Sequence, residues 1–202
     1  MVNAQGAWEK LKLGNEHWVA GKLEHPNQTV ERRVQTAKHQ DPFAVVFGCI
    51  DSRVPPEIVF DQGIGDLFVI RTGAQVLDQG IVLGSVEFGP NGYPSARLIV
   101  VLGHTECGAV TAAYDHFKNG TYVPEYITAV VDALRPAYLE AEGKPGDPIL
   151  NMVHAQVQLT VDKLTADPLL AELIKEQGLQ IVGGVYHLVT GRVQRLDEPD
   201  PA

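Results

Sequence analysis

Short, continuous apolar runs bounded by glycine dominate the chain from residue 42 onward. The four clearest runs are 43–47, 67–70, 97–102 and 179–182. Runs without polar alternation are typical of strands buried on both faces, as in parallel sheets covered by helices. We therefore expect an α/β fold whose centre is a mostly parallel sheet of four strands.

The segments between these runs have the apolar spacing of helices. They are 81–88, 109–117, 126–142 and 149–164, and the last begins at Asp147-Pro148, a suitable N-cap and first-turn pair. After a turn at Thr190-Gly191, the segment 192–196 predicts an added edge strand. The expected architecture is a sheet flanked by helices.

The first 40 residues differ from the rest and are expected to form an N-terminal helical arm. In 7–19, Trp8, Leu11 and Trp18 alternate with charged residues, which indicates an amphipathic helix with an aromatic face. These tryptophans could pack on the core of their own chain, but we expect this helix to pack on a partner subunit. Residues 1–202 are expected to be a single domain, with a loose tail at 197–202.

Composition excludes several classes of protein. The chain has 202 residues, a net charge of −9 and only two cysteines, which excludes a disulfide scaffold and gives no basic footprint for nucleic acid. No apolar run approaches the roughly 20 residues that span a bilayer. The first residues lack the basic and apolar regions of a secretory signal. We expect a cytoplasmic protein that binds neither membrane nor nucleic acid.

Two of the apolar runs end in the same pattern, in which a glycine and then a residue able to bind metal follow the strand. These clusters are Gly48-Cys49-Ile50-Asp51-Ser52-Arg53 and Gly103-His104-Thr105-Glu106-Cys107. The carboxyl ends of neighbouring parallel strands meet at one edge of a sheet, where such folds place their sites. We therefore expect Cys49 and His104 to converge, although 55 residues separate them.

Together the clusters supply two thiols and one imidazole, a ligand set of catalytic zinc that leaves a fourth position open. Each of these residues alone would more often be an ordinary core or surface residue, but both cysteines of the chain fall in the two clusters. Asp51 could accept a hydrogen bond from a zinc-bound hydroxide while Arg53 holds its carboxylate. Alternatively, Asp51 could bind the zinc itself and close the site.

These residues resemble the signature of the β-class carbonic anhydrases, Cys-x-Asp-x-Arg followed some fifty residues later by His-x-x-Cys. The similarity is not confined to these residues: four segments, two of which contain signature residues, are similar to segments of that family, and the resemblance covers roughly residues 5–196. The segments are 48–55, 68–71, 84–88 and 100–104.

The resemblance implies one zinc ion per subunit, held by Cys49, His104 and Cys107, with Asp51 and Arg53 as a catalytic pair beside it. It implies reversible hydration of CO₂ to bicarbonate and a proton, in which zinc-bound hydroxide attacks CO₂. It also implies an obligatory dimer, or a tetramer built from dimers, because several substrate-binding residues come from the neighbouring subunit in the family. The substrate-binding residues implied here are Gln40, Phe68, Phe88 and Gly108.

Two alternatives stay open on the residues alone. One is hydrolysis of a sulfur analogue such as COS or CS₂ on the same scaffold. The other is a non-catalytic zinc or thiol-switch protein, in which Asp51 fills the fourth position permanently and oxidation of Cys49 or Cys107 releases the metal.

Overall fold

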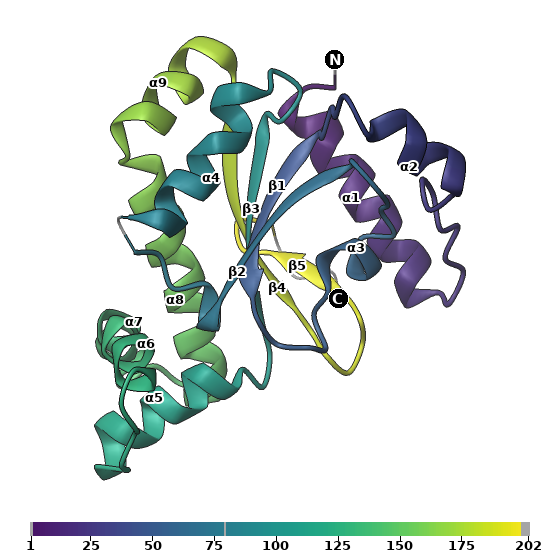
Figure 1. Cartoon of the computed structure of the whole chain (residues 1–202). Coiled ribbons are helices and arrows are strands. Elements are labelled where there is room, and N and C mark those ends of the chain that lie inside the picture. The colour runs from purple at the N-terminus through teal and green to yellow at the C-terminus, as the bar shows by residue number, and fades with distance from the viewer. Residues whose placement is uncertain (1, 79, 199–202) are drawn as a thin grey trace.

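A five-stranded sheet forms the centre of the molecule in the computed structural model, which describes residues 2–78 and 80–198 (Figure 1). The strand order is β2-β1-β3-β4-β5; the first four strands are parallel, and β5 runs antiparallel to β4. The predicted sheet of four parallel strands with an added edge strand is therefore confirmed. The strands are β1 (Ala44–Cys49), β2 (Leu67–Thr72), β3 (Leu98–His104), β4 (Gln180–Tyr186) and β5 (Val193–Arg195).

Helices cover both faces of the sheet, so the molecule has three layers (Figure 1). One face carries α1 (Ala4–Val19) and the short α3 (Pro56–Val59). The other face carries the remaining helices of the α/β body, and each face has its own buried apolar cluster. These helices are α4 (Ile81–Gly92), α5 (Gly108–Asn119), α6 (Ile127–Ala133), α7 (Arg135–Ala141), α8 (Pro148–Thr165) and α9 (Pro168–Gln177).

Proline and aspartate set the boundaries of these helices. The Asp147 side chain accepts a hydrogen bond from the backbone N–H of Ile149 at 2.8 Å, which caps α8 as predicted. The helix predicted over 126–142 is wrong as a single element, since it breaks at Leu134 into α6 and α7. Pro136 explains the break, because its ring lacks an N–H and clashes with the carbonyl four residues earlier. The prediction also missed α9, which the Asp167 side chain caps in the same way.

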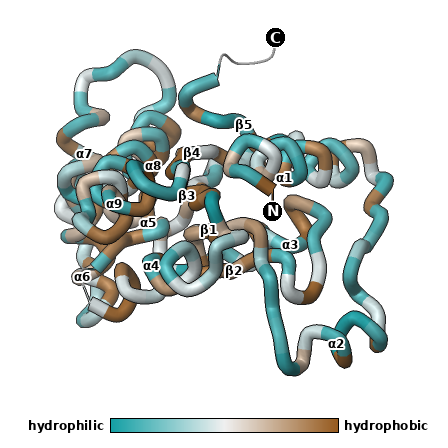
Figure 2. The backbone as a smooth tube through the Cα atoms, turned by 90° about the horizontal axis from the view of Figure 1, so that it is seen from above, coloured by the Kyte–Doolittle hydropathy of each residue, from teal (hydrophilic) through white to brown (hydrophobic). Residues whose placement is uncertain are grey.

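The tryptophans of α1 pack inside their own chain. Trp8 and Leu11 are buried against the sheet, and Trp18 Nε1 donates a hydrogen bond to Tyr186 Oη at 3.0 Å. The aromatic face that was expected to contact a partner is thus used internally, and contact of α1 with a second subunit stays a prediction. By contrast, α2 (Val30–Thr36) stands apart from the sheet and buries none of its residues (Figure 2).

The ends of the chain add little to this framework. Asp197 forms an ion pair with Arg195 at 2.6 Å, so the part of the predicted loose tail that can be described is tied to β5. The rest of that tail, 199–202, lies outside the described residues. Within 2–78 and 80–198, the helices are all too short or too polar to cross a bilayer.

Candidate metal centre

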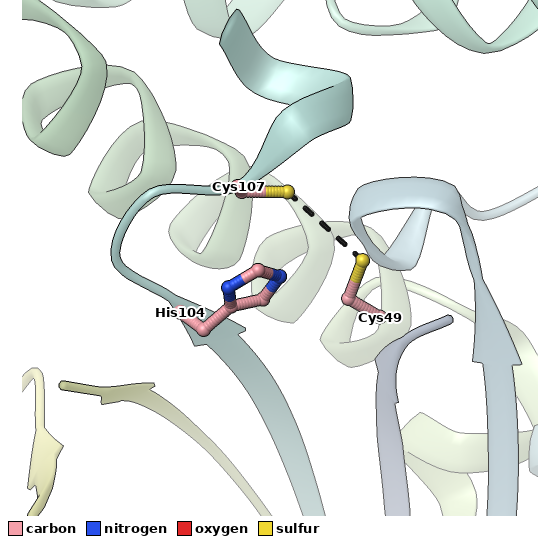
Figure 3. A group of neighbouring side chains, drawn as sticks. All are labelled: Cys49, His104 and Cys107. Carbon is pink, nitrogen blue, oxygen red and sulfur yellow. Dashed lines mark hydrogen bonds between the residues drawn. The ribbon is translucent and has the colours of Figure 1, made fainter. Parts of the chain in front are cut away.

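The carboxyl edge of the sheet brings the three predicted metal ligands together (Figure 3). Cys49 is the last residue of β1, His104 is the last residue of β3, and β1 and β3 are hydrogen-bonded neighbours. Cys107 lies just before the first residue of α5. The ligand atoms of all three residues lie within 4.8 Å of one another, and all three residues are buried. The expected convergence of the two clusters is confirmed.

The imidazole of His104 is oriented to bind a cation. Its Nδ1 lies 2.9 Å from the backbone carbonyl of Thr105, which fixes the ring proton on Nδ1 and leaves a lone pair on Nε2. That Nε2 atom is buried and has no hydrogen-bond partner among the described residues. A buried polar atom without a partner is costly, and a metal ion facing Nε2 would remove that cost. The site therefore fits a metal.

The two thiols also favour a cation. Cys49 Sγ and Cys107 Sγ are 3.9 Å apart, and the hydrogen bond between them lowers the pKa of Cys49 and raises the pKa of Cys107. The second proton is hard to remove because it would leave two thiolates side by side. A divalent cation between them would offset that repulsion and allow both to ionise. Zn²⁺ is the metal that this combination of thiolate and imidazole ligands suits best.

The pair Asp51 and Arg53 lies beside the three candidate ligands. Arg53 donates two parallel hydrogen bonds to the Asp51 carboxylate, at 2.9 Å from Nε and 2.7 Å from a terminal nitrogen, and a third to the carbonyl of Glu106. These bonds lower the pKa of Asp51 to about 2. Asp51 Oδ2 lies 3.9 Å from His104 Nε2, so the carboxylate faces the same space as the imidazole lone pair.

Two further residues hold this edge in place, and sequence reasoning assigned neither a role here. Arg71, on β2, donates hydrogen bonds to the carbonyls of Cys49 at 2.7 Å and Asp51 at 2.6 Å. The backbone N–H of Ala74 points at Cys49 Sγ from 3.3 Å. Ala74 is in the left-handed region at a φ of 49°, a conformation that alanine adopts only when packing imposes it. Arg71 lies in a segment that resembles the family, whereas no sequence signal identifies Ala74.

The predicted substrate-binding residues are divided between the two edges of the sheet. Gly108 follows Cys107 directly and lies beside the metal ligands. Phe68, however, pairs with Val45 near the start of β1, whereas Cys49 pairs with Thr72. This register places Phe68 four residues, or about 13 Å, from the level of Cys49 along the strands.

Phe68 therefore lies at the edge of the sheet where the parallel strands begin, the amino edge, and the other two predicted residues, Phe88 and Gln40, lie near it. Phe88, near the end of α4, has its ring centroid 6.4 Å from that of Phe68, and Gln40 precedes β1. Within one chain, the structure therefore does not bring Gln40, Phe68 or Phe88 to the metal ligands. These three residues all contact Tyr93 instead, a residue that sequence reasoning did not identify. Gln40 Nε2 lies 3.0 Å from Tyr93 Oη.

Comparison with known proteins gives a consistent result. Residues 44–193 match the family model described as carbonic anhydrase. The chain is 43% identical over 197 residues to carbonic anhydrase 2 of Mycobacterium tuberculosis, covering 97% of this chain and 94% of that protein. It is 42% identical to a carbonic anhydrase of Mycolicibacterium smegmatis, covering 95% and 93% of the two chains.

Solved structures show the same fold. The β-carbonic anhydrase CafA of Aspergillus fumigatus superimposes with a TM-score of 0.74 at 26% identity, covering 96% of this chain and 92% of that one. A structure from a study of two tetrameric β-carbonic anhydrases of Sordaria macrospora gives a TM-score of 0.73 at 21% identity, covering 95% and 97%. Fold, ligand cluster and relatives agree, and the chain belongs to the carbonic anhydrase family, in its β class.

Proposed function

We propose that this chain is a zinc enzyme that interconverts CO₂ with bicarbonate and a proton. One observation carries the proposal beyond family membership. It is the buried cluster of Cys49, His104 and Cys107, in which His104 Nε2 has a free lone pair and no partner among the described residues. A buried donor set of this kind leaves a polar atom unpaired until a cation binds in it.

A zinc ion held by these residues would supply Lewis acidity that lowers the pKa of a water molecule bound to it. Asp51 Oδ2 faces the space in front of His104 Nε2, where it could accept a hydrogen bond from a water molecule and orient that water toward CO₂. Arg53 keeps the carboxylate ionised and in place. The backbone N–H of Gly108, at the start of α5, can donate to a substrate oxygen. In this proposal Asp51 and Arg53 are the catalytic residues of the chain.

The substrate pocket requires a second copy of the chain in this proposal. Gln40, Phe68 and Phe88 lie at the amino edge, away from the metal ligands of their own chain. They can form the pocket wall only if a partner subunit brings them to its neighbour's site. A homodimer in which each amino edge completes the other chain's carboxyl edge meets this requirement. Assembly of such dimers into tetramers and a cytoplasmic location stay predictions.

Stopped-flow CO₂ hydration with a pH indicator tests the enzymatic proposal, together with the zinc content of the purified chain. We expect one zinc per subunit and a hydration rate well above that of buffer at alkaline pH. A zinc-loaded chain with no rate above buffer would exclude the proposal. COS and CS₂ as substrates in the same assay test the sulfur-analogue alternative.

The thiol-switch alternative has one supporting observation, since Asp51 Oδ2 is close enough to the His104 lone pair to compete for the metal. X-ray absorption at the zinc edge separates the two functions. A change from aspartate to solvent oxygen between neutral and alkaline pH favours the enzyme. A closed site at both pH values, in a chain without activity, favours the switch.

A further inference from the structure

Among the described residues, the Gln40 side chain makes one hydrogen bond, to Tyr93. Gln40 lies in the segment 37–43, between α2 and β1, which has no regular secondary structure, and its side chain is exposed. An exposed glutamine samples many rotamers, and ordering it costs conformational entropy. Its carboxamide nitrogen is within hydrogen-bond distance of Tyr93 Oη at 3.0 Å.

Tyr93 is well placed to anchor that carboxamide, because both its backbone and its ring are held. Its N–H donates to the carbonyl of Gly89 at 2.9 Å, which closes the last turn of α4. Its ring packs edge-on against Phe68 with centroids 5.0 Å apart, and lies tilted against Phe88 with centroids 6.2 Å apart. Such aromatic contacts fix a ring in both position and tilt. The hydroxyl is therefore presented from a rigid support to a flexible segment.

Gln40 and Tyr93 face the same open cavity. It has a volume of about 480 Å³, and His39 also lines it. The hydrogen bond to Tyr93 uses one N–H of the Gln40 carboxamide and fixes the plane of that carboxamide. The remaining N–H and the carbonyl oxygen are then free to contact another molecule. The three aromatic rings and the amide thus form one unit, although 53 residues separate Gln40 from Tyr93.

We propose that Tyr93 is a positioning residue, whose hydroxyl holds the carboxamide of Gln40 in the orientation in which it contacts substrate in the neighbouring subunit's site. This inference rests on the proposed function, because it needs both a CO₂ site and a second copy of the chain. Tyr93 itself does not touch the reacting atoms. It acts through Gln40, and Phe68 and Phe88 keep it in place.

A double-mutant cycle tests this role. The variants are Tyr93→Phe, Gln40→Ala and the combination, each measured by stopped-flow CO₂ hydration as the intact zinc-loaded protein. Phenylalanine keeps the ring contacts and removes only the hydroxyl. We expect Tyr93→Phe to lower kcat/KM about five-fold, the equivalent of one net hydrogen bond. In the Gln40→Ala background, the same change should have no further effect.

Matched controls separate positioning from general damage. Tyr126→Phe removes a hydroxyl from a tyrosine that is 91% exposed and should leave every rate unchanged. Zinc content and thermal unfolding of Tyr93→Phe should equal those of the wild type, since the ring packing is retained. If Tyr93→Phe unfolds at lower temperature, the cycle is also measured on stability, and coupling to Gln40 seen in stability alone counts against the proposal.

The outcomes distinguish this inference from the proposed function. An active wild type with an unaffected Tyr93→Phe variant would overturn the role of Tyr93. So would an equal loss with and without Gln40, because the hydroxyl would then act by another route. A zinc-loaded wild type without hydration activity would overturn the proposed function and this inference with it.

Discussion

The two edges of the sheet differ in how far their predicted site residues are buried. At the carboxyl edge, Cys49, His104 and Cys107 are at most 3% exposed, and contacts from Arg71 and Ala74 support them. At the amino edge, Gln40 is exposed and Phe88 is 62% exposed, beside an open cavity. In the proposed function this difference has a use. Metal ligands need a rigid, dry frame, which the carboxyl edge supplies, whereas the open amino edge is available to a second copy of the chain.

The largest expected effect belongs to the carboxyl edge. Cys49→Ser replaces a thiolate ligand with a hydroxyl that binds zinc poorly, and the nearby Asp51 carboxylate is held by Arg53. We expect loss of bound zinc and a hydration rate equal to that of buffer. Metal analysis and stopped flow on the same sample check both. Full zinc occupancy in this variant would contradict the assignment of Cys49 as a ligand.

Mixing two impaired chains tests whether the edges of different chains work together. Cys49→Ser keeps its amino edge intact, and Gln40→Ala keeps its metal ligands intact. Each mixed dimer would therefore contain one complete site. When equal amounts of the two chains are refolded together, random pairing makes half of the dimers mixed. Since each mixed dimer has one complete site of two, the mixture should recover about a quarter of wild-type activity.

The control for this mixture pairs two defects of the same edge. Cys49→Ser refolded with Arg53→Ala should show no more than the average activity of its two components, since no combination of those chains contains an intact carboxyl edge. If the first mixture shows only the average of its two components, each site is complete within one chain, and the amino edge has another use.

Arg53→Ala probes the carboxyl edge without removing a ligand. The variant leaves the Asp51 carboxylate without its two parallel hydrogen bonds. Loss of a partner that orients groups around a metal typically costs 10-fold to about 100-fold in activity or metal affinity. We expect a loss of kcat/KM in that range. Arg53→Lys should recover only part of it, because an ammonium group cannot make the two-point contact. Full activity of Arg53→Ala would mean that Asp51 needs no support, and full activity of Arg53→Lys would mean that the two-point contact is not required.

The two edges also differed in how far they could be predicted from the sequence. Cys49 and His104 each follow a glycine after a buried run, and the rule that parallel strands end at one edge brings them together. Nothing comparable connects Gln40 with Tyr93, since neither lies in a periodic segment and their contact depends on how α4 packs. The left-handed Ala74 was equally out of reach, because tertiary packing imposes a conformation that alanine does not favour.

Asp61 tests how the loop between α1 and α2 is held to the rest of the chain. This buried aspartate accepts hydrogen bonds from the backbone N–H groups of Glu24 and His25, and from His17. Burial raises its pKa, but these bonds outweigh burial and hold the pKa below its usual value. Because the folded-state pKa is lowered, its contribution to stability is present above the unfolded pKa of about 3.9 and is lost as pH falls through the folded value.

Asp61→Asn should therefore cost about 1–3 kcal/mol of unfolding free energy at neutral pH, since an amide cannot accept all three bonds. The difference from wild type should shrink as the solution is acidified below the unfolded pKa. Urea unfolding at a series of pH values measures it. A difference that grows toward acid pH would show that the carboxylate is not the stabilising form.

A matched pair of glycine substitutions compares the packing of the two edges directly. Gly103 precedes His104, and a Cβ atom there would lie 2.6 Å from a methyl carbon of Val157, whereas a Cβ at Gly92, near the amino edge, meets nothing within 4 Å. We expect Gly103→Ala to destabilise the fold by about 1–3 kcal/mol through overpacking, and to weaken zinc binding because the added methyl displaces the end of β3. Gly92→Ala should change stability by no more than about 0.5 kcal/mol and leave zinc binding intact. Urea unfolding and zinc titration at one protein concentration compare the two. Equal effects would mean that the carboxyl edge has room to adjust, and the rigidity assigned to it would have to come from the metal rather than from the fold.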